Sequence, residues 1–294
     1  MNISTPSHHR LAIACLLFSA SMWGLIWYPV RLLADAGMSA VWSSLVMYVA
    51  AGVLIIPVLW RQYHIISQHF NDLMLLAVAA GVTNVTFLVA LTEGEVMRVM
   101  LLFYLSPLWT VLLGRWWLKE KLSLAAIVML LIAMSGSIVM LWNKDIGWPW
   151  PHGLADWLAL TASIAFSINN VQARKLGTVS MSVKTSVVWW GVVITSILVL
   201  VAQQSPVPDA SISAWLGAWL LGWFGIVAMT VAVLYGVANM PVYRSAVIML
   251  FELVVAAIAT WWLTNEAMTM QEWLGGGLIL VAAYGVARTE MKSD

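Results

Sequence analysis

Apolar stretches of about 20 residues recur along the whole chain, and short polar connections separate them. A helix of this length crosses a hydrocarbon core of roughly 30 Å. Prolines in connections such as 143–152 (NKDIGWPWPH) and 203–209 (QQSPVPD) end helices. The pattern predicts an all-α integral membrane protein with ten transmembrane helices, at 11–34, 40–60, 73–91, 96–116, 122–142, 154–174, 183–202, 215–235, 242–263 and 273–287.

Composition supports this class. Of the 294 residues, 62% are hydrophobic and 9% are charged, whereas roughly 25% are charged in an average soluble domain. The net charge of +1 gives no electrostatic footprint for nucleic acid, and the single cysteine, Cys15, excludes a disulfide scaffold. The five histidines lie in tails and loops without carboxylate or cysteine partners, and no glycine-rich phosphate loop occurs. We therefore expect no metal, no cofactor and no nucleic-acid partner.

Lysines and arginines indicate the orientation, because they concentrate in cytoplasmic loops. With the N-terminus in the cytoplasm, ten of the 14 lie on the cytoplasmic side and two, Arg31 and Lys144, outside. The opposite orientation inverts this count. We expect a multi-pass protein of the bacterial inner membrane with both termini cytoplasmic. The ten are Arg10, Arg61, Arg115, Lys119, Lys121, Arg174, Lys175, Lys184, Arg288 and Lys292.

The loop at 143–152 divides the chain into two halves of five predicted helices each. Five spans reverse the orientation of the following half, so we expect two inverted five-helix repeats, 1–142 and 153–294, joined by the linker 143–152. Positive charge is lost from the copy that ends outside, where Asn-Glu-Ala replaces Lys-Glu-Lys. Aligning 98–123 with 244–269 pairs Arg98 with Arg244, Trp116 with Trp262 and Glu120 with Glu266.

The fourth helix of each half resembles that of the EamA-domain permeases of the drug/metabolite transporter superfamily. That family carries a Ser-Pro or Glu-Pro pair there, followed by Gly-Glu-(Arg/Lys)-Leu. The matching residues are Leu105-Ser106-Pro107 with 118–122 (LKEKL), and Phe251-Glu252-Leu253 with Thr264-Asn265-Glu266. Leu253 replaces the expected proline, which removes the usual reason for a helix break in the ninth span. The resemblance extends from Met22-Trp23-Gly24 to 275–277.

The resemblance implies a ten-helix bundle with a substrate cavity between the repeats. The first, third, fourth, sixth, eighth and ninth helices would line this cavity. The fifth and tenth helices would be peripheral or would form a homodimer.

Glu252 lies nearest the middle of its span. A charged side chain there costs about 2.5–3.5 kcal/mol on insertion scales, so burial should favour the protonated acid. Arg244 lies eight residues away, roughly 12 Å along the axis, too far for direct pairing. Glu252 is then a proton carrier, a binder of a substrate ammonium group, or a brace held by neighbouring hydroxyls and amides.

Further polar and aromatic positions could line a transport path. Arg98 and Arg244 suit a carboxylate, yet both are shallow enough to snorkel to headgroups, and Glu93 and Glu95 could neutralise Arg98. Asparagines in the third and sixth helices have two possible roles. They could replace the water molecules that hydrate a solute, or they could form hydrogen bonds that hold helices together. The predicted substrate cavity comprises Trp23, Trp27, Asn84, Arg98, Tyr104, Asn169, Tyr235 and Glu252.

The expected function is secondary transport by alternating access, with export of amino acids or related small amphipathic metabolites. A proton-coupled importer of a small metabolite is one alternative. An intramembrane lipid-modifying enzyme is a remote one, because such enzymes show clustered His, Asp and Glu or a nucleophile with its base. The third alternative function is that of a non-transporting membrane scaffold. The expected partners are a small-molecule substrate, the lipid bilayer and a second copy of the chain, and we expect no enzymatic activity.

Overall fold

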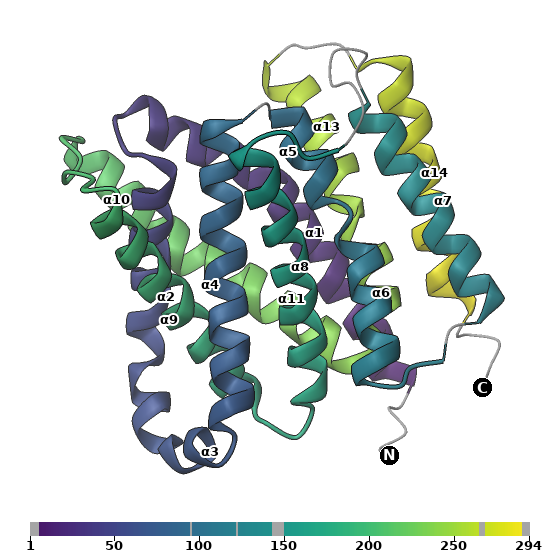
Figure 1. Cartoon of the computed structure of the whole chain (residues 1–294), viewed down its shortest axis with the longest axis horizontal. Coiled ribbons are helices and arrows are strands. Elements are labelled where there is room, and N and C mark those ends of the chain that lie inside the picture. The colour runs from purple at the N-terminus through teal and green to yellow at the C-terminus, as the bar shows by residue number, and fades with distance from the viewer. Residues whose placement is uncertain (1–5, 95, 122, 143–149, 265–267, 290–294) are drawn as a thin grey trace.

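The computed structural model describes residues 6–94, 96–121, 123–142, 150–264 and 268–289, and every regular element in these ranges is a helix (Figure 1). In the first half these are α1 (Pro6–Asp35), α2 (Ala40–Arg61), α3 (Tyr63–Gln68), α4 (Phe70–Glu93), α5 (Val96–Phe103), α6 (Ser106–Trp117) and α7 (Leu124–Leu141). In the second they are α8 (Leu154–Lys175), α9 (Met181–Ala202), α10 (Ile212–Leu220), the π-helical η2 (Leu221–Ile226), α11 (Val227–Asn239), α12 (Val242–Met249), α13 (Phe251–Thr264) and α14 (Met270–Thr289).

Eight segments of the described chain are long and apolar enough to cross a membrane. The protein is therefore a multi-pass membrane protein. Two of the ten expected spans do not qualify, although α8 and α14 form helices of 22 and 20 residues at those places. Both carry charged residues near their ends, and α8 holds polar side chains that are buried within the bundle. The eight segments are Arg10–Asp35, Ala40–Arg61, Phe70–Glu93, Arg98–Trp117, Leu124–Leu141, Met181–Ala202, Ile212–Asn239 and Val242–Leu263.

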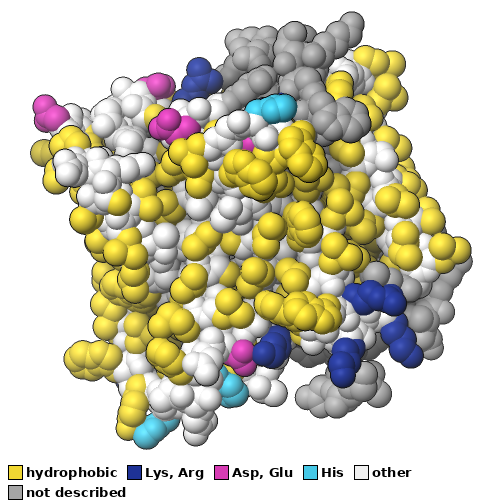
Figure 2. All heavy atoms as spheres, viewed as in Figure 1, with side chains coloured by type: hydrophobic (Ala, Val, Ile, Leu, Met, Phe, Trp, Pro, Cys, Tyr) yellow, Lys and Arg dark blue, Asp and Glu magenta, His cyan; other side chains and the backbone are white. Residues whose placement is uncertain are grey.

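The long helices run between an upper and a lower edge of the bundle (Figure 1). The start of α1 and the end of α14 both lie at the lower edge, where α3 also lies. On the face shown in Figure 2, hydrophobic side chains form a broad band across the middle. Most of the described Lys and Arg side chains on that face lie below this band.

The two halves pack in equivalent pairs. In the first half α1 packs on α11 and α13, and in the second half α8 packs on α4 and α6. Other large interfaces join α9 to both α4 and α2, and α7 to α14. Because the fifth and tenth helices, α7 and α14, cover each other within one chain, only their outer faces are free to join a second copy. A homodimer through these faces stays a prediction.

Glycines allow two close approaches that position the helices. A Cβ on Gly136 of α7 would lie 2.7 Å from the carbonyl oxygen of Gly275 on α14. A Cβ on Gly24 of α1 would lie 2.6 Å from the carbonyl oxygen of Glu252. Both distances are shorter than any real contact, so only glycine fits without movement. Gly24 therefore lets α1 lie directly against the first turn of α13.

The fourth and ninth spans are both broken, at equivalent places of the two repeats. The first breaks between α5 and α6, where Leu108 N–H donates to the carbonyl of Leu105 (3.0 Å). The second breaks between α12 and α13, where Leu253 N–H donates to the carbonyl of Leu250 (3.1 Å). Both bonds are of the tighter 3₁₀ type. The ninth span is therefore broken although Leu253 replaces the expected proline, because a 3₁₀ turn forms the break instead.

Candidate functional site

Tyr104 and Glu252 meet where the two broken spans face each other. Tyr104 lies in the break between α5 and α6, and Glu252 lies in the first turn of α13. The Tyr104 hydroxyl donates a hydrogen bond to Oε1 of Glu252. Tyr104 is buried and Glu252 is half-buried. A hydroxyl of the first repeat is thus bonded directly to the acid of the second repeat.

A cavity of about 20 Å³ lies beside this contact. A space of this size holds about one water molecule, so the bundle is closed around the site. Thr110 lies in the wall, and its buried hydroxyl has no hydrogen-bond partner among the described residues. Residues from α5, α6, α8, α12, α13 and the two breaks line the cavity, namely Phe103, Tyr104, Ser106, Pro107, Thr110, Phe166, Ala246, Met249, Leu250 and Glu252.

Aromatic rings form one wall of this cavity. The ring centroid of Phe103 lies 5.6 Å from that of Phe166 and 5.6 Å from that of Tyr104. Behind it, the ring of Phe87 lies 4.4 Å from Phe103. The Ser167 hydroxyl donates to the carbonyl of Ser106 (2.8 Å), which ties α8 to the start of α6. These contacts fix the first repeat's side of the site.

The structure brings together two of the eight predicted cavity residues, Tyr104 and Glu252, around this cavity. Asn84 accepts a hydrogen bond from Ser44 on α2 (2.6 Å), and Asn169 donates to the carbonyl of Leu76 on α4 (3.2 Å). These two asparagines therefore connect helices, as the alternative interpretation of the sequence expected.

The three other aromatic candidates lie elsewhere in the bundle. Trp23 and Tyr235 are half-buried and pack against the core. The indole N–H of Trp27 is buried and has no partner among the described residues. That any of these three residues lines a substrate path stays a prediction.

Arg98 forms a buried ion pair at the upper edge. Its Nε lies 2.8 Å from Oδ2 of Asp156, and the side chains are 11% and 8% exposed. Arg98 also donates to the carbonyl of Trp150, and His152 N–H donates to the same Asp156 oxygen (2.8 Å). This network joins α5 to the beginning of α8.

Sequence reasoning missed Asp156 as a partner of Arg98. The available signal was an acidic residue in the first turn of a helix, where the helix dipole favours negative charge. Of the two acids that the sequence offers near Arg98, Glu93 is exposed and Glu95 lies outside the described residues.

Glu120 forms a second network at the lower edge. Its Oε1 lies 3.7 Å from Nε of Arg174 at the end of α8, and its Oε2 accepts from Val242 N–H at the start of α12 (3.1 Å). Arg174 also donates to the carbonyl of Ala238 at the end of α11. Burial raises the pKa of the Glu120 carboxyl, while Arg174, Val242 N–H and Arg244 act in the opposite direction. The predicted repeat partner, Glu266, lies outside the described residues.

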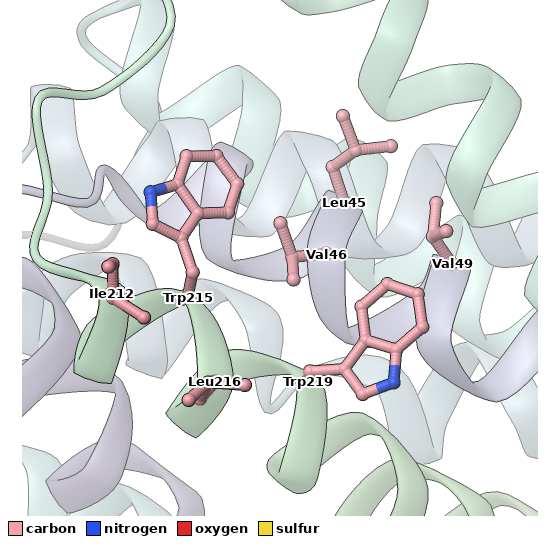
Figure 3. A pocket seen from close by; sticks show the side chains of 7 residues that line it. All are labelled: Leu45, Val46, Val49, Ile212, Trp215, Leu216 and Trp219. Carbon is pink, nitrogen blue, oxygen red and sulfur yellow. The ribbon is translucent and has the colours of Figure 1, made fainter.

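A larger groove of about 470 Å³ lies between α2 and α10 (Figure 3). Figure 3 shows Trp215 and Trp219 on one side and Leu45, Val46 and Val49 on the other. Every side chain that lines it is apolar, so the groove offers little to orient a polar solute. The small cavity at Glu252 is therefore the better candidate site.

A bundle of apolar helices in two equivalent halves, with broken helices facing each other at a half-buried acid, is the architecture of a secondary membrane transporter. The model of the EamA-like transporter family matches residues 10–142 and again residues 153–288. The chain belongs to the EamA-like transporter family.

One solved structure, described only as "Crystal structure of protein", has the same fold, with a TM-score of 0.74 and 18% sequence identity. The match covers 98% of this chain and 99% of the other. No match is found among curated proteins.

Proposed function

We propose that the protein is a secondary transporter that exports amino acids or related small amphipathic metabolites by alternating access. The observation that carries this proposal is the hydrogen bond between Tyr104 and Glu252, because it joins the two broken helices of opposite repeats. The moving parts are the halves 1–142 and 153–294, joined by the linker 143–152. The cavity between them is too small for a metabolite, so a substrate enters only when the halves separate.

The proposed setting is the bacterial inner membrane, with both termini in the cytoplasm. The charge count along the sequence supports this orientation. So do the described basic residues at the ends of α2, α6 and α8, which share the lower edge with the start of α1. These residues are Arg61, Arg115, Arg174 and Lys175.

Glu252 is the proposed proton carrier. An ionised carboxylate is costly in hydrocarbon unless a cation lies beside it. Among the described residues, the titratable group in contact with Glu252 is Tyr104, which is a neutral donor. The acid is therefore protonated while the site is closed and releases its proton when the site opens to water.

Charged residues on the helices packed against α13 lie toward the ends of those helices. On α12, Arg244 is eight residues from Glu252, roughly 12 Å along the axis. The others lie near helix ends: Arg10, Arg31 and Asp35 on α1, and Glu272 and Arg288 on α14.

Counterflow and pH-driven uptake in proteoliposomes test this proposal. Glu252→Gln imitates the protonated acid at nearly equal volume, so the variant should still exchange substrate but ignore an imposed pH gradient. Tyr104→Phe is the matched control, because it removes the partner hydroxyl and keeps the acid. If Glu252→Gln keeps wild-type pH-driven transport, the acid is a structural brace. If the wild type also ignores the gradient, the protein is a uniporter.

The direction of transport needs a measurement in cells. Metabolite profiling of medium and cells should compare a strain that overproduces the protein with a deletion strain. Export predicts that the substrate accumulates in the medium of the overproducing strain. Accumulation inside the cells instead would favour the alternative, a proton-coupled importer.

A further inference from the structure

The cavity at Glu252 can carry negative charge but no positive charge. Glu252 contributes a carboxylate once the site has opened and the proton has left, and the ten lining residues include no lysine, arginine or histidine. Two arginines at the bundle edges are held by other groups, since Arg98 pairs with Asp156 and Arg174 with Glu120. The buried Lys184 donates to the carbonyl of Ala173 (3.3 Å). A substrate ammonium thus finds an opposite charge at this cavity, and a substrate carboxylate finds no cationic side chain.

Several N–H groups at the helix starts beside the breaks are missing or already bonded. At α6, Pro107 has no N–H, and Leu108 N–H is already bonded to the carbonyl of Leu105. At α13, Leu253 N–H is bonded to the carbonyl of Leu250. Glu252 itself lies in the first turn of α13, so its own carboxylate already occupies the favourable end of that helix dipole. A second anion at this end would meet repulsion.

The remaining walls suit an organic cation. The rings of Phe103, Tyr104 and Phe166 line the cavity together with the carboxylate. Aromatic faces attract ammonium groups, most strongly where water is excluded. Thr110 is 1% exposed and lines the cavity, and its buried hydroxyl has no partner in the described part of the chain. It can accept a hydrogen bond from an N–H group of a ligand.

We propose that this cavity selects protonated organic amines with an apolar or aromatic body, and that it disfavours the same body when it carries a carboxylate. The proposal rests on the transport function above and, among the amino acids and related amphipathic metabolites proposed there, favours the amines that lack a free carboxylate, including amino acid esters and amides. The ammonium group takes the Glu252 oxygen that now accepts from Tyr104, while the rings surround the apolar body.

Three ligands with one phenyl body separate the two charges: phenylethylamine, phenylalanine and 3-phenylpropanoate. Binding to the purified full-length protein is measured by titration calorimetry in nanodiscs. We expect phenylethylamine to bind at least about tenfold more tightly than phenylalanine, because both offer an ammonium group but the carboxylate of phenylalanine loses its water without meeting a cationic side chain and is repelled by Glu252. We expect 3-phenylpropanoate to bind most weakly. Equal affinity for phenylalanine, tighter binding of 3-phenylpropanoate, or no binding of phenylethylamine overturns the proposal.

Variants locate the effect at the cavity. Glu252→Gln should lose at least about tenfold in phenylethylamine affinity, and Glu252→Asp should lose less because it keeps the charge. Glu272→Gln is the matched control, since this acid lies in the first turn of α14 and bonds to Thr269. Size-exclusion profiles exclude a folding defect in each variant. Equal losses in Glu252→Gln and Glu272→Gln would contradict the site assignment.

Counterflow with the same ligands separates this proposal from the general transport function. Phenylethylamine that binds but is never exchanged means that transport fails while the selectivity holds. Exchange of phenylalanine at the same rate as phenylethylamine means that transport holds while the selectivity fails.

Discussion

Replacement of Gly24 by alanine tests the contact that places Glu252. The added Cβ would lie 2.6 Å from the Glu252 carbonyl oxygen, 3.0 Å from Cβ of Val255 and 3.1 Å from N of Ala256. Two of these atoms are backbone, so α1 and α13 must move apart by a substantial fraction of an ångström. Overpacking of this kind typically costs about 1–3 kcal/mol. We expect a lower melting temperature in detergent and slower counterflow, because the first turn of α13 carries the acid.

Gly277→Ala is the control for this substitution. Gly277 lies inside α14, and a Cβ there would meet nothing within 4 Å. Alanine at an open helical position is neutral or stabilises by up to about 1 kcal/mol. Melting and counterflow of both variants are measured side by side. If Gly24→Ala melts and transports like Gly277→Ala, the close approach of α1 to Glu252 does not exist in the working protein.

Three further changes test the network at each edge and the orientation. Arg98→Gln leaves Asp156 buried without its cation, so it should lower the free energy of unfolding by about 3–5 kcal/mol. Adding Asp156→Asn should recover part of this loss, as a double-mutant cycle measured by thermal unfolding would show. The folded protein has a raised Glu120 pKa, so it binds this proton more tightly than the unfolded chain and loses stability when the carboxyl ionises. The stability of Glu120→Gln relative to wild type should therefore be higher at neutral pH than near pH 4.5, the ordinary pKa of glutamate. Melting temperatures of both proteins across pH measure this difference. In a cysteine-free background, a cysteine at Gln204 should react with an impermeant thiol reagent in intact cells and one at Gln68 should not, and the reverse labelling would refute the orientation.

Hydropathy predicted the class and most of the spans because the bilayer requires about 20 apolar residues in a row. It also predicted spans where α8 and α14 lie. These helices form, but α8 is too polar to count as a span by composition. Its buried residues Ser163, Ser167 and Gln172 face other helices, and hydropathy along one chain cannot see those neighbours.

The candidate site was predicted in part. Tyr104 and Glu252 were both named from the sequence, yet their hydrogen bond joins residues 148 positions apart and depends on how the two repeats pack. Asp156 was missed for the same reason, since its partner Arg98 lies 58 positions away. Periodicity indicates which face of a helix is apolar, but only packing decides which polar groups meet.

The two helix breaks differ in how firmly the covalent chain maintains them. At the first, Pro107 has no N–H and can never donate to a preceding carbonyl, so a helix through this point always lacks one backbone hydrogen bond. At the second, Leu250, Phe251, Glu252 and Leu253 all keep their N–H groups. No missing N–H group maintains this break, so it depends on the contacts around it. The covalent chain itself imposes the break of the first repeat, whereas packing imposes the break beside the acid of the second.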